Sequence, residues 1–329
     1  MAKIISIFLI VSAAFWGAFS AAASDQPDLQ TWLVELRQDA RDAGISEATL
    51  DAALTGVQLI PRVIELDRKQ PEFTLTFAQY LERVVPVSRQ QRARARYDTH
   101  RELLTEIGDK YGVQPRFIVA LWGIETDFGR VLGGFDVIPA LVSLSYDGRR
   151  SAFFRKELIA ALKIIDEGHV TADNMKGSWA GAMGQSQFMP TSFRRFAEDY
   201  NGDGRRDIWS TQADVFASAA NYLKRSGWRN DITWGREVRL PQSGIASPGQ
   251  AMKLHDDKTW KPLPEWAQLG LLNIDGKALP TRAIRARLVL PDGADGRAYL
   301  VYDNFEAILK WNRSNYFAIA VGTLSDSMR

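Results

Sequence analysis

The sequence contains no cysteine and only 3 histidines among its 329 residues. The absence of cysteine excludes disulfide bonds and thiolate metal sites, and it also excludes a lipoprotein anchor. Internal repeats and low-complexity tracts are absent too. An excess of one charge is also lacking, because 41 basic and 39 acidic residues leave a formal net charge of +2. This balance does not indicate nucleic acid as a partner, and the pI near 8.7 favours an anionic partner only weakly.

An apolar run stands close to the N-terminus. Lys3 precedes IISIFLIVSAAFWGAF, and a small-residue stretch that includes Ala21 and Ala23 follows. This layout is typical of a secretory signal peptide that is cleaved before Ser24. A retained transmembrane anchor is the alternative, because the run approaches spanning length, but the small residues favour cleavage. We therefore predict an exported protein that keeps no membrane anchor and is not a lipoprotein.

Helical hydrophobic patterns dominate the rest of the chain, and Ser46 predicts the N-cap of one early helix. Short alternating segments between proline and glycine turns predict strands at 236–241, 285–293 and 298–303. The expected fold class is therefore mainly α (α+β), with a small β-rich insertion. The predicted division along the chain is a signal peptide (1–23), an N-terminal helical region (24–110), a helical core (111–229), the β-rich insertion (230–303) and C-terminal helices that complete the core (304–329).

One carboxylic acid stands in an apolar setting. Glu125 follows Ala-Leu-Trp-Gly-Ile, and Phe128 comes three residues later. Because desolvation disfavours the charged form, we expect the pKa of Glu125 to be raised. A carboxyl group that is still protonated near neutral pH can act as the general acid that cleavage of a glycosidic bond requires. The alternative is an ordinary surface glutamate near a helix end.

A segment rich in small residues runs from Gly177 to Pro190, GSWAGAMGQSQFMP. Its glycines and alanines allow close approach of the backbone, while Met183, Gln185 and Gln187 can supply adaptable contacts to a ligand. A tight turn that packs helices together explains the same composition equally well.

Acid and amide oxygens recur at alternate positions in DYNGDGRRDIW. Asp199, Asn201 and Asp203 occupy positions one, three and five of an EF-hand loop, with Gly204 at six and the carbonyl of Arg205 at seven. Position twelve is Ser210 instead of the usual glutamate, so Asp214 would have to supply the remaining ligand. The pattern favours a structural Ca²⁺ site over a plain Asn-Gly-Asp-Gly turn.

Near the C-terminus, Trp311, Asn312 and Tyr316 are spaced to lie close together on one helical face. Core packing explains the two aromatic residues at least as well as contact with a substrate does.

Taken in order, these motifs resemble the lytic murein transglycosylase B family. The resemblance covers about 73–326 and rests on Glu-Thr-x-x-Gly, Ser-Trp-Ala-Gly-Ala-Met-Gly, Gln-Phe-Met-Pro, Asp-x-Asn-Gly-Asp-Gly and Trp-Asn-x-Ser. It implies a lysozyme-like helical catalytic core, peptidoglycan glycan strands as substrate, a periplasmic location and no cofactor for the chemistry. The serine between Gln185 and Gln187 departs from the family pattern.

The resemblance also implies roles for individual residues. Glu125 matches the family's single acid/base, and Ser178 and Gln187 match groups that line the cleft. The remaining matches are an arginine pair (Arg149, Arg150), cleft residues (Tyr80, Tyr222, Asn312) and calcium ligands (Asp199, Asn201, Asp203, Asp214). A surface salt bridge is the competing explanation for the arginines, and packing is the competing explanation for the tyrosines.

The family cleaves the β-1,4 bond between N-acetylmuramic acid and N-acetylglucosamine without adding water. One carboxyl group suffices if it first protonates the leaving oxygen and then deprotonates the C6 hydroxyl of the same sugar, which closes a 1,6-anhydro ring. Asp127 would point to another side of a helix from Glu125, which argues against a hydrolase with two carboxylates. The alternatives are a muramidase that uses water and a non-catalytic peptidoglycan-binding scaffold.

Overall fold

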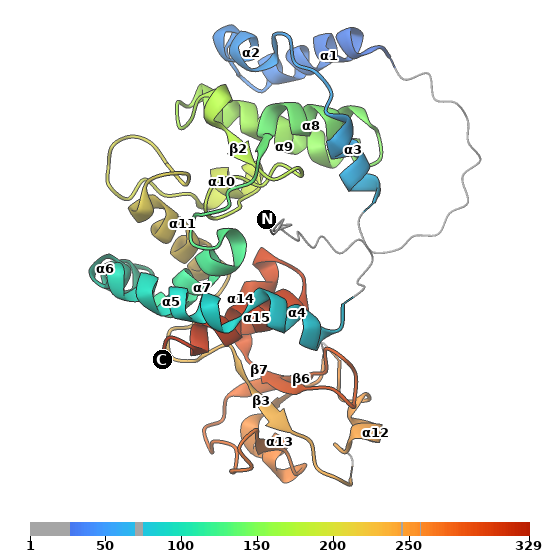
Figure 1. Ribbon diagram of the computed structural model, residues 1–329, viewed down its shortest axis with the longest axis vertical. Coiled ribbons are helices and arrows are strands. Elements are labelled where there is room, and N and C mark those ends of the chain that lie inside the picture. The colour runs from blue at the N-terminus through green and yellow to red at the C-terminus, as the bar shows by residue number, and fades with distance from the viewer. Residues whose placement is uncertain (1–26, 70–74, 245, 257) are drawn as a thin grey trace, which may run out of the picture. The chain divides into compact units, whose positions relative to one another are not determined.

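A computed structural model describes residues 27–69, 75–244, 246–256 and 258–329 (Figure 1). Helices form most of this part of the chain, and strands are few and short, which confirms the predicted fold class. The chain divides into two compact units. Of the described residues, the first unit contains 27–69 and 125–219, and the second contains 75–124 and 220–329.

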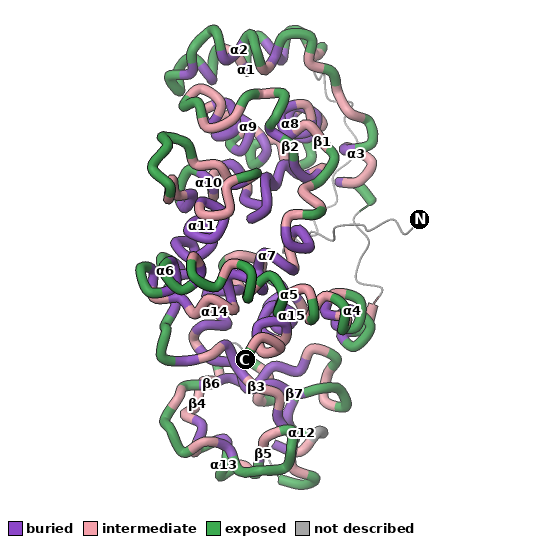
Figure 2. Tube along the Cα trace, turned by 60° about the vertical axis from the view of Figure 1, so that its left-hand side comes forward, coloured by how far each residue is buried: buried purple, intermediate pink, exposed green. Residues whose placement is uncertain are grey.

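The core of the first unit is a pair of packed helices, α8 (Val137–Tyr146) and α9 (Ser151–Asp166). Eight of the ten residues of α8 are buried, and α9 buries one face, which includes Phe154, Leu158 and Leu162 (Figure 2). Around this pair lie α1 (Leu29–Asp42), α2 (Glu47–Leu54), α3 (Pro61–Arg68), the 3₁₀ turn η1 (Ala172–Asn174) and α10 (Pro190–Phe196). β1 (Phe135–Asp136) pairs antiparallel with β2 (Lys176–Gly177).

The second unit combines helices with a sheet. Its helices are α4 (Phe77–Val84), α5 (Val87–Thr99), α6 (Arg101–Tyr111), α12 (Pro248–Ala251), α13 (Leu263–Gln268), α14 (Asp303–Trp311) and α15 (Asn315–Asp326). Helices α4 and α14 both pack on α15. The backbone amide of Phe77 at the start of α4 donates to Asp292 at 2.7 Å, so a loop of the sheet region holds this helix end.

The sheet is antiparallel, with strand order β4-β6-β7-β3-β5. The strands are β3 (Gly235–Arg239), β4 (Trp260–Pro262), β5 (Leu272–Asn273), β6 (Arg285–Val289) and β7 (Ala298–Val301). Trp266 of α13, Leu288 of β6 and Leu300 of β7 are fully buried in one apolar cluster. The three strands that the sequence predicted are therefore confirmed as β3, β6 and β7.

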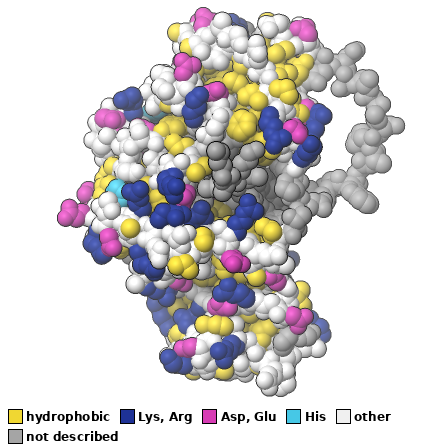
Figure 3. Space-filling view, in the orientation of Figure 1, with side chains coloured by type: hydrophobic (Ala, Val, Ile, Leu, Met, Phe, Trp, Pro, Cys, Tyr) yellow, Lys and Arg dark blue, Asp and Glu magenta, His cyan; other side chains and the backbone are white. Residues whose placement is uncertain are grey.

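Two helices cross the division between the units. α7 (Pro115–Thr126) passes from the second unit to the first after Ile124, and α11 (Gln212–Arg225) passes back after Ala219. Within the described residues, no helix is long and apolar enough to cross a membrane. The predicted signal peptide, 1–23, lies outside the described residues. Acidic and basic side chains are interspersed on the face drawn in Figure 3, in keeping with the near-balanced composition.

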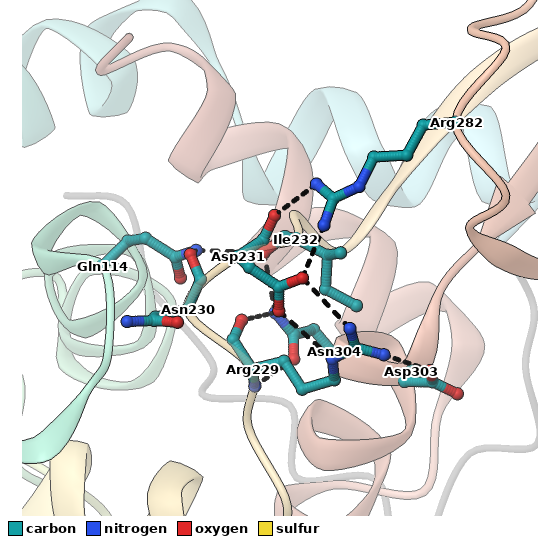
Figure 4. A network of polar contacts seen from close by, with 8 residues as sticks. All are labelled: Gln114, Arg229, Asn230, Asp231, Ile232, Arg282, Asp303 and Asn304. Carbon is teal, nitrogen blue, oxygen red and sulfur yellow. Dashed lines mark hydrogen bonds and ion pairs between the residues drawn. The ribbon is translucent and has the colours of Figure 1, made fainter.

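A polar network fixes the chain where it enters the sheet (Figure 4). The buried Asn304 accepts from the backbone amide of Arg229 at 2.7 Å and donates to the carbonyls of Arg229 and Ile232. Gln114, which precedes α7, donates to the carbonyl of Ile232 at 3.0 Å. Side chains thus supply hydrogen-bond partners to the backbone of this irregular segment, which is exposed at 229–231 and buried at Ile232.

The C-terminal segment is not one continuous helix. α14 ends at Trp311, Asn312 has extended backbone angles, and Ser314 caps α15 by accepting from the amide of Phe317. The expectation that Trp311, Asn312 and Tyr316 share one helical face is therefore wrong. A side chain that caps the next turn offers the backbone an alternative to continued helix, and the hydrophobic pattern alone does not show this.

Candidate functional site

Glu125 is the second-last residue of α7 and is half-buried. Leu121, Trp122 and Phe128 around it in the sequence are all buried. The helix stops abruptly because Asp127, Phe128 and Gly129 have φ values of 50°, 63° and 78° in the left-handed region. This backbone region is rare for residues other than glycine and is held only where the surroundings dictate it. The apolar residues beside Glu125 in the sequence are thus buried, while the role of Glu125 as an acid stays a prediction.

Asp127 lies beyond the last helical residue, so the expectation that it sits on the helix is wrong, and its direction relative to Glu125 stays a prediction. It is buried, with 5% of its surface exposed, and it pairs with the Arg130 side chain at 2.9 Å. A carboxylate that is held by a guanidinium is stabilised in its charged form. The ion pair gives Asp127 a structural role at the end of α7.

The small-residue segment forms a tight loop in the first unit. Ser178 accepts the backbone amide of Ala182 at its hydroxyl oxygen, and Met183 bridges to both Gly177 and Phe188. A Cβ added to Gly177 would lie 2.2 Å from the carbonyl oxygen of Ala182, so only glycine fits there. Met183 is fully buried. The packing explanation is therefore confirmed, while contact of Ser178 and Met183 with a ligand stays a prediction.

Gln187 is buried in this loop with φ at 48°. Its amide nitrogen donates to the carbonyls of Leu132 and Gly184, each at 2.9 Å. Two hydrogen bonds to carbonyl oxygens fix the orientation of the side-chain amide.

The predicted arginine pair has a buried partner that the sequence did not reveal. Arg149 and Arg150 both form ion pairs with Asp67 of α3, which has only 2% of its side chain exposed. The Nε of Arg149 lies 2.9 Å from Asp67, and Arg149 keeps 45% of its side chain exposed. The guanidinium of Arg150 also lies over the Phe154 ring, 4.8 Å from its centroid. Salt bridging is thus confirmed, and two guanidinium groups on one carboxylate leave one positive charge in excess.

The other predicted cleft residues, Tyr80, Tyr222 and Asn312, lie in the second unit. Tyr222 donates its hydroxyl to the carbonyl of Lys310 and packs on Trp311, with ring centroids 4.7 Å apart. Tyr80 packs on Tyr316 at 5.5 Å. The Oδ1 atom of Asn312 is buried and accepts no hydrogen bond, which leaves an acceptor available to a small donor. Grouping these residues with Glu125 rests on the resemblance and stays a prediction.

Side-chain carboxylates of the predicted calcium loop accept hydrogen bonds from backbone amides of the same loop. Asp199 accepts backbone amides from Gly202, Asp203 and Gly204, and Asp203 accepts the amide of Arg205. Asp214 is fully buried, and its two oxygens accept the amides of Tyr200 and Asp207 at 2.8 Å each. Burial raises the pKa of the Asp214 carboxyl above its ordinary value. Across the described ranges, no three acidic, histidine or cysteine side chains are grouped as metal ligands.

Sequence reasoning missed the role of Asp67 and the contact between Thr126 and Gln185. Asp67 holds the arginine pair from more than 80 residues away, so no local pattern could connect them. Thr126 and Gln185 stood inside recognised motifs, but their motifs gave no sign that they contact each other. The Thr126 hydroxyl donates to the carbonyl of Gln185 at 3.0 Å, which joins the end of α7 to the small-residue loop.

A mostly helical fold, with a half-buried glutamate at a helix end tied to a small-residue loop, defines a protein of the lysozyme-like class. The chain belongs to the transglycosylase SLT domain family, because the model of that family matches residues 28–326. The resemblance to the lytic murein transglycosylase B family that the sequence motifs indicated is therefore confirmed.

Relatives and solved structures support this assignment. The membrane-bound lytic murein transglycosylase B of Escherichia coli is 32% identical over 234 residues, which are 70% of this chain and 62% of that protein. The chain thus spans less than two thirds of that relative. SltB3 from Pseudomonas aeruginosa, solved with NAG-anhNAM-pentapeptide, matches with a TM-score of 0.87 at 44% identity, over 91% of this chain and 79% of its own. Escherichia coli Slt35, solved with calcium, matches with a TM-score of 0.75 at 27% identity, over 93% of each chain.

Proposed function

We propose that the protein is a peptidoglycan lytic transglycosylase that cleaves the bond between N-acetylmuramic acid and N-acetylglucosamine and forms a 1,6-anhydro product. The observation that carries the proposal is a half-buried Glu125 at the end of α7, whose nearest acid along the sequence, Asp127, is bound to Arg130. SltB3, which is 44% identical to this chain, was solved in complex with NAG-anhNAM-pentapeptide, and this supports the proposal of an anhydro product.

In the proposed mechanism, Glu125 protonates the glycosidic oxygen while positive charge develops on the muramyl ring. The 2-acetamido oxygen of that sugar stabilises the reacting carbon, which makes a second carboxylate unnecessary. The Glu125 carboxylate then takes the proton of the C6 hydroxyl, and this oxygen attacks C1. A tethered nucleophile has a very high effective concentration, so it outcompetes water where the site is dry.

Glu125→Gln in the purified protein tests this proposal on peptidoglycan sacculi. Because glutamine cannot donate or accept the proton, we expect release of soluble fragments to fall by about 10²–10⁴-fold. Mass spectrometry of the wild-type digest should show anhydro-muramic ends, whereas reducing ends would indicate a muramidase that uses water. Asp127→Asn is the matched control, since it removes the neighbouring acid and should leave the folded protein active.

If Glu125→Gln released fragments as fast as the wild type, the catalytic assignment would be wrong and a binding scaffold would be the better description.

We also propose that the protein is exported after cleavage of the predicted signal peptide, and this proposal has a separate test. N-terminal sequencing of the exported protein should begin at Ser24. Limited proteolysis tests the predicted domain limits at 110, 229 and 303.

The donor chemistry of the loop at 199–207 fits Ca²⁺. Asp199, Asn201 and Asp203 offer oxygen atoms at the right spacing, and Gly204 has the φ of 89° that the sharp turn needs. Because the side-chain amide of Asn201 and the backbone carbonyl of Arg205 would supply two of the ligands, the site does not require a cluster of three acidic side chains. A bound Ca²⁺ would offset the negative charge of the loop, including that of the buried Asp214, and its role in our proposal is structural.

A further inference from the structure

A continuous path of hydrogen bonds leads from the residue after Glu125 to the loop that ends at Trp209. Thr126 is fully buried, and its hydroxyl donates to the carbonyl of Gln185 at 3.0 Å while it accepts the amide of Gly129 at 3.1 Å. One hydroxyl therefore holds both the abrupt end of α7 and the small-residue loop. Its neighbour in the chain is the proposed acid.

Gln185 continues this path on the other side. Its backbone amide donates to the carbonyl of Ile208 at 2.8 Å, and its side-chain amide donates to the carbonyl of Trp209 at 2.8 Å. Its Oε1 accepts from the Gln212 side chain at 3.2 Å. Gln185 is 7% exposed, so these bonds form in a largely dry environment. A buried amide with its partners satisfied is held in one orientation.

The backbone packs closely around Gln185. A Cβ added to Gly129 would lie 2.5 Å from Oε1 of Gln185, and one added to Gly184 would lie 2.6 Å from the carbonyl oxygen of Ile208. Gly129, which follows the left-handed residues Asp127 and Phe128, therefore lies directly against the side-chain amide of Gln185. Close packing of this kind transmits small displacements instead of absorbing them.

We propose that Thr126 and Gln185 are positioning residues for Glu125, and that through them the loop at 199–209 fixes where the acid stands. The inference rests on the proposed function and extends it to two residues that do not themselves touch the reacting atoms. A carboxyl group must lie within hydrogen-bonding reach of the glycosidic oxygen, so a displacement of about 1 Å costs on the order of 10²-fold in rate.

The first test compares Thr126→Val, which keeps the shape and removes the hydroxyl, with Thr126→Ser, which keeps the hydroxyl. On sacculi or soluble glycan strands we expect Thr126→Val to lower kcat by about 10–100-fold with KM within about threefold. Thr126→Ser should stay within about threefold of the wild type. A Thr126→Val protein that melts earlier yet keeps kcat within twofold, measured on the folded fraction, would show a structural role only and overturn the proposal.

The second test asks whether the two residues act through one path. Gln185→Met has a similar length and no amide, and we expect it to lower kcat by about tenfold. The double variant with Thr126→Val should then be no slower than Thr126→Val alone, because residues on one path are not additive. Losses that multiply would contradict a common path. Hydrogen exchange of 126–132 and 183–188 reports whether these segments loosen together.

A wild-type control separates this inference from the proposed function. If neither the wild-type protein nor Glu125→Gln releases anhydro-muramic ends, the proposed function itself is wrong. If the wild type is active and only Glu125→Gln is impaired, the function stands and the positioning role of Thr126 and Gln185 is wrong.

Discussion

At the scale of single residues, the buried carboxylate of Asp67 holds one half-buried arginine and one exposed arginine. Asp67 is almost fully buried, and its carboxylate accepts one guanidinium at each oxygen. A buried carboxylate is tolerated only when it is paired, so Asp67 requires at least one of the arginines. The second arginine leaves a net positive charge at this cluster.

We predict that Asp67→Asn costs about 2–4 kcal/mol of unfolding free energy, because it leaves Arg150 half-buried without its counter-ion. Arg149 is partly exposed and contributes less of this loss. Urea denaturation monitored by circular dichroism measures the change. Arg62→Gln is the control, since it breaks a largely exposed pair with Glu65 and should change stability by less than about 0.5 kcal/mol. Equal effects of the two variants would refute this account of the cluster.

The sequence identified most of these residues by type and motif but not by partner. The setting of Glu125 could be predicted because the apolar residues around it are its neighbours in the chain. Asp67, by contrast, is isolated in sequence from Arg149, and Thr126 meets Gln185 across 59 residues. Contacts of this range depend on how helices pack, which composition and spacing do not encode locally.

At the scale of elements, α2 is held to α9 through its own N-cap. Ser46 accepts the amide of Thr49, as its cap position predicted, and donates its hydroxyl to Asp166 at 2.6 Å. Asp166 also accepts from the amide of Ser46 at 3.0 Å and the hydroxyl of Thr49 at 2.9 Å. These hydrogen bonds, the Ser46 hydroxyl first, lower the pKa of the Asp166 carboxyl from 3.8 to about 2.

We predict that Asp166→Asn lowers stability by about 2 kcal/mol at neutral pH, since hydrogen bonds to a charged acceptor are lost. The folded-state pKa is the lower one, so this contribution is full above about pH 4 and disappears as the pH falls toward 2. Denaturation of both proteins between pH 6 and pH 2 should show the two curves converge. A gap that stays constant over this range would contradict the assignment.

Glu65→Gln supplies the matched comparison. The pKa of Glu65 is also lowered to about 2, by the Lys69 and then the Arg62 side chains. Both partners are exposed ions, so salt should abolish the effect of Glu65→Gln. The donors of Asp166 are mainly neutral hydroxyl and amide groups, so the effect of Asp166→Asn should persist in 1 M salt.

The elements themselves were predicted where their patterns were long. The helix that Ser46 caps and the strands β3, β6 and β7 follow from periodicity and from capping, proline and glycine positions. The break at Asn312 was missed because apolar residues continue on both sides of it. Ser314 stands among four consecutive polar residues, 312–315, and this short stretch is a weak signal against the apolar pattern on both sides.

At the scale of the whole molecule, each compact unit is assembled from two separate stretches of the chain, with α7 and α11 passing between them. The division predicted from the sequence has limits at 110, 229 and 303, and it could not place the crossings inside α7 and α11 because each of these helices is continuous. The two residues on either side of the crossing in α7 are Ile124 and Glu125, so the proposed acid stands where the chain returns to the first unit. The loop at 199–207 lies in the same unit as Glu125, so its stability bears on the unit that holds the proposed acid.

The calcium proposal is tested at this scale by thermal unfolding. A ligand that binds only the folded state stabilises it by RT ln(1 + [L]/Kd), so we expect Tm to rise with added CaCl₂ and to fall with EDTA. A concentration 100 times the Kd corresponds to about 2.7 kcal/mol, or roughly 4 °C for a chain of this size. Asp203→Ala should lose the response to Ca²⁺, whereas Asp173→Ala, an acidic residue outside the loop, should keep it. A wild-type Tm that is unchanged by both EDTA and millimolar Ca²⁺ would leave Asp199, Asn201 and Asp203 as the side chains of an ordinary turn, stabilised by the backbone amides that they already accept.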